Sequence, residues 1–424
     1  MRYYVNDMCK TVNVKGIYIL CNVENRSVVG LDEKGYKFWN EITEGKDIYP
    51  KNTEDKELIR SLLDLDFISE EPYDNSKHHG LNIVSAYLHI TNYCNLHCLG
   101  CYSYDGDRNS GIEPTLDNLK KALFELDRAQ ISNVVISGGE PFLRRDLYDL
   151  LYYARSNLSN IKHLSVITNG TVKVDYSIYK GIIDEITVSV DGYSEIQPTF
   201  IRDEGIFNKI INTVKEIKKS GIEVSILPTL HSKNYNDINN YFELSERLEV
   251  PINFSILSAC ETSVLKDYLL KDHQLEILAE NMMNYGVPVN DTPIGVSLEA
   301  GMSCGTGYTV ISVAANGNVY PCHMLHSDKF YIGNIFNTSL KDMFYNNPVI
   351  DRLSNFTVED IKECSDCSYK YFCAGGCRAR AYYKYGDICH KDSYCRLSYH
   401  FFDMAIDNIL SCIKNKKEVE SCGT

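Results

Sequence analysis

Residues 91–102 read TNYCNLHCLGCY and place Cys94, Cys98 and Cys101 at the spacing CxxxCxxC. Three soft thiolates at this spacing can hold three corners of a [4Fe–4S] cluster and leave the fourth iron open to another ligand. A structural zinc site and three buried cysteines are the alternatives, but zinc normally takes four ligands and often uses CxxC pairs. The spacing therefore favours an iron–sulfur cluster with one open iron.

Around this stretch, short β-rich runs alternate with helical periods between about residues 84 and 260. The expected strands are 84–90, 133–137, 163–168, 185–190, 223–230 and 252–257, and the expected helices include 116–129, 147–156, 207–220 and 237–248. Six strands, each followed by a helix, predict an α/β fold with a parallel barrel or open sheet. Ligands bind at the carboxyl ends of the strands in such folds, and the cysteine triplet directly follows the first strand.

The 424 residues are enough for two or three domains, and 44% hydrophobic with 24% charged residues is ordinary for a globular protein. No segment has the length and apolarity of a membrane span, and residues 1–7 lack the apolar core of a signal peptide. We therefore expect a cytoplasmic protein without a membrane partner. The net charge of −14 argues against nucleic acid as the main partner, because phosphate binding needs clustered Lys and Arg.

Both ends of the chain differ from this alternating region. Residues 16–23 and 27–31 form a strand-like pair, and helical stretches at 33–42 and 57–63 follow, which suggests a small winged-helix unit ending in a polar linker at 72–80. After residue 300 cysteines become dense up to Cys395, and a final helix is expected over 397–413. The predicted domains are therefore residues 1–80, 81–300 and 301–424.

Sixteen cysteines could indicate a disulfide framework, but ten of them fall into metal-type spacings in a chain that we expect to be cytoplasmic. Reduced thiolates that bind iron explain them better. A loop-rich region of this kind also needs metal to compensate for a thin core.

Polar motifs follow the later strands. The second strand is followed by Ser137-Gly138-Gly139-Glu140-Pro141, whose glycines allow close backbone approach and whose carboxylate can engage an amino group. Thr168-Asn169-Gly170 and Ser189-Val190-Asp191-Gly192 end the third and fourth strands, and a polar turn would also explain them. Arg202 can bind a carboxylate through its planar guanidinium, although an exposed arginine is equally common.

The cysteine spacing, its flanks and the Gly-Gly-Glu sequence resemble the radical S-adenosylmethionine (radical SAM) superfamily. The resemblance implies a partial (β/α)6 barrel that binds S-adenosylmethionine beside a [4Fe–4S] cluster on the three cysteines. Gly138, Gly139 and Glu140 would hold the methionyl amine, and Ser189 would contact the ribose. The other implied cofactor contacts are Asn169 in the same cleft, Arg202 at the cofactor carboxylate and Tyr102, which would pack beside the adenine or shield the cluster.

A second set of cysteines has a distinctive spacing: Cys304-x12-Gly317-x4-Cys322, then Cys364-x2-Cys367-x5-Cys373-x3-Cys377, then Cys395 after seventeen more residues. This spacing resembles the SPASM domain of radical SAM enzymes that modify peptides and proteins, with zinc binding as the main rival. The resemblance implies two auxiliary [4Fe–4S] clusters, three clusters in all. The first would be held by Cys304, Cys322 and Cys377, and the second by Cys364, Cys367, Cys373 and Cys395.

This assignment leaves one iron of the first auxiliary cluster without a cysteine. Some relatives carry an eighth cysteine shortly before the position of Cys304, but residues 295–300 contain none. Glu299, Cys260, a water or a substrate thiolate are the alternatives for the vacant position. Cys389 lies outside the family spacing and is expected to be a spare thiol.

Residues 31–42 resemble the small peptide-binding domain, similar to the pyrroloquinoline quinone chaperone, found on enzymes that mature ribosomally made peptides. Such domains bind a leader peptide by adding a strand to their sheet. A DNA-binding winged helix is the competing idea, and the acidic balance of the chain disfavours it.

The resemblances together imply a radical SAM/SPASM peptide-maturation enzyme of the thioether-forming, sactisynthase-like kind. A 5′-deoxyadenosyl radical would abstract a hydrogen atom from a precursor peptide that carries a leader and core cysteines, with flavodoxin or ferredoxin as electron donor. Alternative activities are carbon–carbon crosslinking, maturation of a cofactor precursor and formation of formylglycine in a sulfatase. An iron–sulfur electron carrier or redox sensor is the non-enzymatic alternative, but it would need no S-adenosylmethionine cleft.

Overall fold

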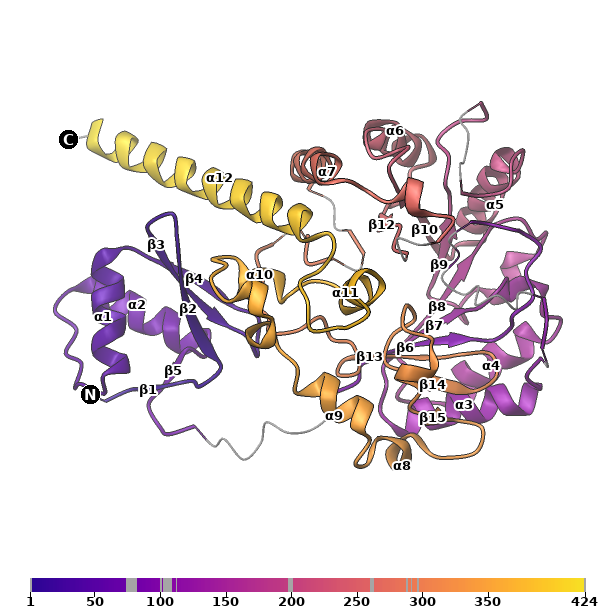
Figure 1. The fold of residues 1–424 in the computed structure, drawn as a ribbon, viewed down its shortest axis with the longest axis horizontal. Helices are drawn as coiled ribbons and strands as arrows, with labels where there is room; N and C mark the ends of the chain where they lie inside the picture. The colour runs from indigo at the N-terminus through magenta and orange to yellow at the C-terminus, as the bar shows by residue number, and fades with distance from the viewer. Residues whose placement is uncertain are drawn as a thin grey trace.

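The structure is a computed structural model that describes residues 2–73, 82–99, 101, 109–111, 113–196, 201–259, 263–286, 289–290, 292–295 and 297–422. In Figure 1 a mainly parallel sheet with its helices lies at the right and the N-terminal domain at the left, and the cysteine-rich C-terminal region lies between them. No helix in the described part of the chain is both long and apolar enough to cross a membrane.

Eight strands form the central sheet in the order β10-β9-β8-β7-β6-β13-β14-β15. Strands β6 to β10 pair in parallel with one another, and β13 pairs in parallel with β6, whereas the pairs β13–β14 and β14–β15 are antiparallel. Their bounds are β6 Ser85–His89, β7 Asn133–Ser137, β8 His163–Thr168, β9 Glu185–Ser189, β10 Glu223–Leu227, β13 Val310–Val313, β14 Asn318–Tyr320 and β15 Gly333–Asn334. The α/β class with a parallel, barrel-like sheet, predicted from the sequence, is confirmed.

The later strands deviate from the expected pattern at a proline. The run expected at 223–230 divides at Pro228 into β10 and β11 (Thr229–Leu230), because proline has no N–H to donate to the ladder. Strand β11 then pairs in parallel with β12 (Ser255–Ile256), which is shorter than the expected strand 252–257. The closing part of the barrel is therefore a separate short pair.

Amphipathic helices connect the strands and bury their apolar sides against the sheet. They are α3 Leu116–Arg128, α4 Leu147–Asn157, α5 Phe207–Ser220, α6 Ile238–Leu248 and α7 Asp272–Tyr285. In α3, for example, Leu119, Leu123 and Leu126 are fully buried in the same core as Leu88 of β6. Thr115 caps this helix by accepting a hydrogen bond from the Asn118 backbone N–H.

The N-terminal domain is a three-stranded antiparallel sheet with two helices. Its order is β2-β3-β4, and its elements are β1 Tyr4–Val5, β2 Cys9–Val14, β3 Ile17–Asn22, β4 Val28–Leu31, α1 Glu33–Thr43, α2 Thr53–Asp64 and β5 Ile68–Ser69. Lys15 and Gly16 join β2 to β3 with φ angles of 52° and 88°, as a tight hairpin turn requires. Strand β2 was not expected from the sequence.

Both faces of this small sheet are covered. Leu20 packs with Trp39 and Leu62 in the domain's own core, whereas Ile19 and its neighbour Cys21 belong to the large core of the molecule. That core also contains Tyr371, Phe402 and Ile406. Ion pairs reinforce the contact, joining Lys10 to Glu359, Lys15 to Asp403 and Asp407, and Arg26 to Glu299.

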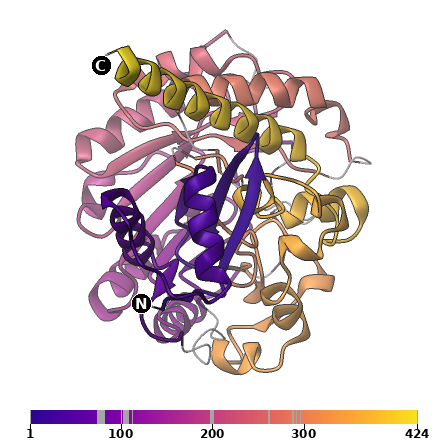
Figure 2. The ribbon, with the colours of Figure 1, turned by 90° about the vertical axis from the view of Figure 1, so that its left-hand side faces the viewer.

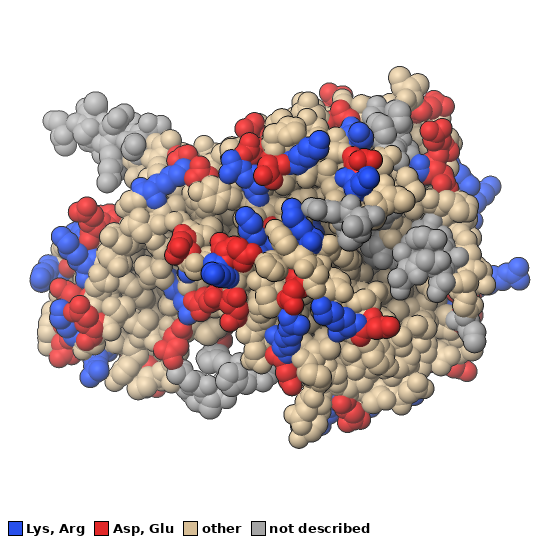
Figure 3. Space-filling view, in the orientation of Figure 1, with Lys and Arg blue, Asp and Glu red and all other residues tan. Residues whose placement is uncertain are grey.

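Short helices and loops make up the C-terminal region until one long helix. The α-helices are α8 Leu340–Phe344, α9 Pro348–Ser354, α10 Lys370–Cys373, α11 Arg378–Tyr385 and α12 Cys395–Cys422. The C-terminal region also has short 3-10 helices at Asp328–Phe330, Val358–Asp360 and Lys362–Cys364. Others lie earlier in the chain, at Pro141–Leu143, Tyr176–Tyr179 and Lys266–Tyr268. Helix α12 packs along α7 and crosses above the N-terminal strands (Figure 2). On the face seen in Figure 3, basic side chains are interspersed with acidic ones.

We expect apolar packing, rather than the ion pairs, to hold the N-terminal domain in place. Ile19→Ala should lower the free energy of unfolding of this domain by about 2–5 kcal/mol. Lys15→Ala should lower it by less than about 1 kcal/mol, because partly exposed ion pairs contribute little. Trp39 is the only tryptophan and is buried in this domain, so its fluorescence in a urea titration measures both effects. Equal losses in the two variants would contradict this view.

Candidate functional site

The cysteine loop, residues 91–101, lies directly against the Gly-Gly-Glu loop, residues 137–141. Gly139 N–H donates to the Thr91 carbonyl at 2.7 Å, and Glu140 N–H donates to the Tyr93 carbonyl at 2.7 Å. A Cβ at Gly138 would meet the Thr91 oxygen at 2.4 Å, and one at Gly139 would meet the Tyr93 oxygen at 2.0 Å. The two glycines were expected to allow a close approach of the backbone. In the structure, it is the cysteine loop that their backbone approaches.

Cys94, the first cysteine, is held by hydrogen bonds at both its backbone and its sulfur. Cys94 N–H donates to Asn109 Oδ1 at 2.8 Å, and the Cys94 sulfur accepts from Leu96 N–H at 3.5 Å and from Asn169 Nδ2 at 3.7 Å. Asn95, inside the loop, is held in turn by Asn169 Nδ2 at 3.0 Å.

The far half of the loop is anchored to the segment after β9. His97 N–H donates to the Asp203 carboxylate at 3.1 Å, and Leu99 N–H donates to the Ile201 carbonyl at 2.6 Å. Both ends of the cysteine loop are thus fixed, while Cys94, Cys98 and Cys101 remain partly exposed. Three accessible thiols on one fixed loop fit a [4Fe–4S] cluster that leaves one iron open.

Glu140 is fully buried, so its carboxylate does not face outward. It accepts hydrogen bonds from Phe142 N–H at 3.1 Å, from the Thr168 hydroxyl at 2.8 Å and from Asn169 N–H at 2.8 Å. Burial raises the pKa of Glu140, and these hydrogen bonds oppose the rise. The carboxylate therefore fixes the end of β8 and the Asn169 side chain beside Cys94, and a direct contact with an amino group stays a prediction.

Arg202 is paired and mostly buried. Its side chain is 11% exposed and its Nε donates to Asp191 Oδ2 at 2.6 Å, while Asp191 Oδ1 accepts from Thr229 N–H at 2.8 Å. The alternative of an exposed, solvated arginine is wrong. Burial alone would lower the pKa of Arg202, but the neighbouring Asp191 carboxylate and Cys98 outweigh it and raise that pKa. Burial raises the pKa of the Cys98 thiol to about 11, and Arg202 acts in the opposite direction.

The parallel strands bring these groups to one edge of the sheet. Ser137, Thr168 and Ser189 end β7, β8 and β9 at the same edge from which β6 enters the cysteine loop. The expected contacts Gly138, Gly139, Glu140, Asn169 and Ser189 thus come from adjacent strand ends. Tyr102 lies outside the described residues.

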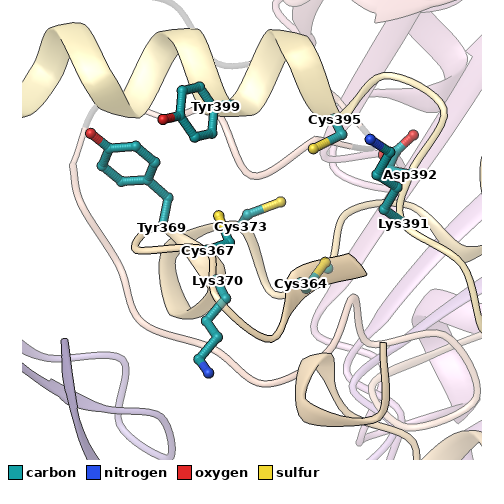
Figure 4. A pocket seen from close by; sticks show the side chains of 10 residues that line it. Cys364, Cys367, Tyr369, Lys370, Cys373, Lys391, Asp392, Cys395 and Tyr399 are labelled. Carbon is teal, nitrogen blue, oxygen red and sulfur yellow. The ribbon is translucent and has the colours of Figure 1, made fainter. Parts of the chain in front are cut away.

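Four cysteines of the C-terminal region surround a single cavity (Figure 4). They are Cys364, Cys367, Cys373 and Cys395, and they come from a 3-10 helix, the loop after it, α10 and the first residue of α12. Burial raises the pKa of the Cys364 thiol to about 11 and raises the pKa values of Cys373 and Cys395 as well. Four thiolates around one cavity fit a [4Fe–4S] cluster, the set expected for the second auxiliary cluster.

The remaining three cysteines of the C-terminal spacing differ from one another in their burial. Cys322 and Cys377 are buried in one small core, and Cys304 is exposed. Glu299, one candidate for the vacant position, forms a 2.8 Å ion pair with Arg26, and Cys260 lies outside the described residues. Cys389 is exposed beside Arg352 and does not line the four-cysteine cavity.

Two histidines, His89 and His326, lie together in the structure, and no motif in the sequence predicted this. His89, which ends β6, lies 4.9 Å from His326 between ring centres, and the His326 Nε2 lies 2.8 Å from the Ser312 hydroxyl oxygen. Burial lowers the pKa of His89 well below its usual value and that of His326 to about 3, so both rings are neutral. Their positions along the chain are too far apart for any spacing pattern to link them.

Comparison with known families agrees with this geometry. A model described as the radical SAM superfamily matches residues 88–245, and the SPASM model, described as an iron–sulfur cluster-binding domain, matches residues 304–368. The chain is therefore a radical SAM enzyme. More narrowly, it belongs to the radical SAM enzymes that carry a SPASM domain, so its cofactors are S-adenosylmethionine, a [4Fe–4S] cluster and auxiliary iron–sulfur clusters.

Three curated relatives are similar over most of their length. An AdoMet-dependent heme synthase of Methanosarcina barkeri is 24% identical, over 72% of this chain and 94% of that protein. The mycofactocin maturase MftC of Mycobacterium ulcerans is 24% identical, over 72% of this chain and 86% of its own. The cysteine-type anaerobic sulfatase-maturating enzyme of Clostridium perfringens is 25% identical, over 76% of this chain and 96% of its own.

Two solved structures share the fold. SuiB of Streptococcus suis bound to the precursor peptide SuiA has a TM-score of 0.59 at 17% identity, covering 93% of this chain and 99% of SuiB. The structure of anSMEcpe with bound AdoMet has a TM-score of 0.64 at 21% identity, covering 78% of this chain and 99% of that one.

We expect Gly139→Ala to separate the two loops of the site. The added Cβ would lie 2.0 Å from the Tyr93 oxygen, so the cysteine loop must move and should lose most of the iron bound there. Iron analysis and the electron paramagnetic resonance (EPR) signal that responds to S-adenosylmethionine measure the loss. Gly295→Ala is the control, because its Cβ would meet only the Ser297 oxygen at 3.9 Å. Normal iron content in Gly139→Ala would contradict the expectation.

Arg202→Gln should shift iron uptake by the apoprotein to higher pH. Arg202 lowers the pKa of the Cys98 thiol, so its loss raises that pKa and reduces the thiolate fraction at any given pH. Anaerobic reconstitution between about pH 7 and 9.5, followed by iron analysis, tests this. Arg155→Gln, which breaks the remote pair with Asp184, should leave the profile unchanged. Identical profiles for Arg202→Gln and wild type would refute the link.

Proposed function

We propose that this enzyme modifies a ribosomally made precursor peptide and forms an intramolecular thioether between a cysteine sulfur and a carbon of the same peptide. Formation of that bond removes one hydrogen atom from the carbon, which the radical would take up, and a proton and one electron from the thiol side, the electron of which an auxiliary cluster would accept. S-adenosylmethionine and its cluster, when bound, supply the hydrogen-abstracting radical. The chain itself has to hold the peptide, orient it and keep water away.

The extent of the fold likeness carries this proposal. The likeness to SuiB bound to a precursor peptide covers 93% of this chain, a share that must include part of the N-terminal domain, whereas the likeness to anSMEcpe covers 78%. A domain that binds a leader peptide suits a maturase of precursor peptides. A sulfatase-maturating enzyme has no need of it.

The N-terminal sheet offers its edges to such a peptide. Both of its faces are packed, so a leader can join it by pairing with an edge strand, β2 or β4. We favour β4, because the Arg26 carbonyl just before it accepts a hydrogen bond from Ala300 N–H at 2.9 Å. Cys304 lies four residues after Ala300 in the chain, so a peptide bound along β4 would continue toward the cysteines of the first auxiliary cluster.

In this proposal Cys94, Cys98 and Cys101 hold the cluster that binds S-adenosylmethionine. The contacts to that cofactor are Gly138, Gly139, Glu140, Asn169, Ser189 and Arg202, with Tyr102 as a further candidate. The four-cysteine cavity holds the second auxiliary cluster, and Cys304, Cys322 and Cys377 hold the first. The missing fourth ligand of the first cluster suggests that a peptide thiolate binds there, and flavodoxin or ferredoxin would supply electrons.

Carbon–carbon crosslinking and maturation of a cofactor precursor are the alternatives, since a mycofactocin maturase is among the relatives. Formylglycine formation is a third, since a sulfatase-maturating enzyme is another. The fate of the substrate's thiol separates these reactions. A thioether consumes the thiol while the sulfur stays in the peptide, a carbon–carbon bond leaves it free, and formylglycine formation from cysteine removes the sulfur.

Co-expression with a short precursor peptide that carries a leader and core cysteines should yield a product lighter by two hydrogen atoms. Iodoacetamide should then fail to label one cysteine, and tandem mass spectrometry should locate the new bond. Cys98→Ala should abolish both the product and the release of 5′-deoxyadenosine with dithionite. A product that still reacts fully with iodoacetamide would refute the thioether, and full activity of Cys98→Ala would refute the assignment of the cluster.

A further inference from the structure

A buried ion pair lies inside the cysteine-rich region. The side chains of Arg380 and Asp392 are 2% and 3% exposed. Arg380 Nε donates to Asp392 Oδ1 at 2.8 Å, and Nη2 donates to Oδ2 at 2.7 Å, which is a two-pronged contact. A buried pair of this kind gains little stability over apolar side chains, because both charges lose their hydration. Its presence here therefore calls for a role beyond packing.

The same carboxylate also binds the backbone at two separate places. Asp392 Oδ2 accepts from Cys377 N–H at 2.7 Å, and Oδ1 accepts from Tyr394 N–H at 2.8 Å. The Asp392 carbonyl accepts from Cys395 N–H at 3.0 Å. One residue thus holds the backbone of Cys377, a member of the first auxiliary set, and the backbone at Cys395, a member of the second.

The loop between the two sets is shaped to the carboxylate. Gly376 has a φ of 70°, and a Cβ there would lie 2.5 Å from Asp392 Oδ2. On its other side, Asp392 lines the four-cysteine cavity, and Figure 4 shows it next to Cys395. Asp392 therefore contacts the first set through its carboxylate, and it contacts the second set through its backbone carbonyl, which accepts from Cys395 N–H.

We propose that Asp392 and Arg380 are positioning residues shared by the two auxiliary clusters. This inference rests on the ligand assignment proposed above. Because one carboxylate holds Cys377 of the first set and Tyr394, the residue before Cys395 of the second set, its loss changes both clusters together. Removing the Asp392 carboxylate takes one negative charge away from both clusters, which stabilises the more negative, reduced form of each cluster and raises both reduction potentials.

Asp392→Asn in the full-length protein loaded with iron tests this proposal. An amide cannot accept from Arg380, Cys377 and Tyr394 as the carboxylate does. Potentiometric titration followed by EPR should show both auxiliary clusters shifted to higher potential. The third cluster, identified by its response to S-adenosylmethionine, should be unchanged. If the variant loses iron instead, both auxiliary clusters should disappear together.

Asp387→Asn is the matched control, because Asp387 also pairs with an arginine, Arg352, but the pair is exposed. It should leave all three clusters unchanged. If Asp392→Asn does not fold, Asp392→Glu moves the carboxylate by one methylene against Gly376 and should alter the EPR signals of both auxiliary clusters.

If either folded Asp392 variant changes only one auxiliary cluster, or neither, this inference is overturned while the ligand assignment stands. A wild-type protein without two auxiliary clusters would overturn the ligand assignment and the inference with it.

Discussion

The contact between Gly138–Gly139 and the carbonyl groups of residues 91–93 is the constraint on which the site depends. No side chain fits between the two loops, and two backbone hydrogen bonds join them. The cysteine loop is therefore positioned by the neighbouring strand β7 as well as by its own strand β6. Glu140 extends the connection to the end of β8, and Asn169 returns from there to Cys94. Three adjacent strand ends thus act as one support for the sulfur ligands.

Buried acids serve the same purpose throughout the molecule. Glu140, Asp191 and Asp392 are each almost completely buried, and each accepts hydrogen bonds from backbone N–H groups of other segments. A buried carboxylate is tolerated only when such partners replace its water. The polar interior of this protein is therefore used to fix loops, and the loops in turn hold cysteines. Hydrogen bonding takes the place of the regular secondary structure that these loops lack.

The three regions of the chain are packed as one body. Strand β13 of the C-terminal region extends the central sheet by pairing with β6, and the N-terminal sheet shares the main core with α12. The N-terminal domain is consequently held against the cluster-binding region and is not a tethered module. Because both faces of its sheet are covered, the N-terminal domain presents the edges of that sheet. The backbone N–H and C=O groups of an edge strand can pair with an extended peptide.

Short-range patterns were sufficient for the cysteine spacings, for strands β6 to β9 and for helices α3 to α6, because each depends on residues close together in the chain. The resemblance of those spacings to known families implied the family, its cofactors and the set of four cysteines that surrounds one cavity. The pairing of Val310 with Ser85, the burial of Glu140, the partnership of Arg202 with Asp191 and the double role of Asp392 could not be read in the same way. Each depends on which distant segments meet, and only tertiary packing decides which buried charge finds which partner.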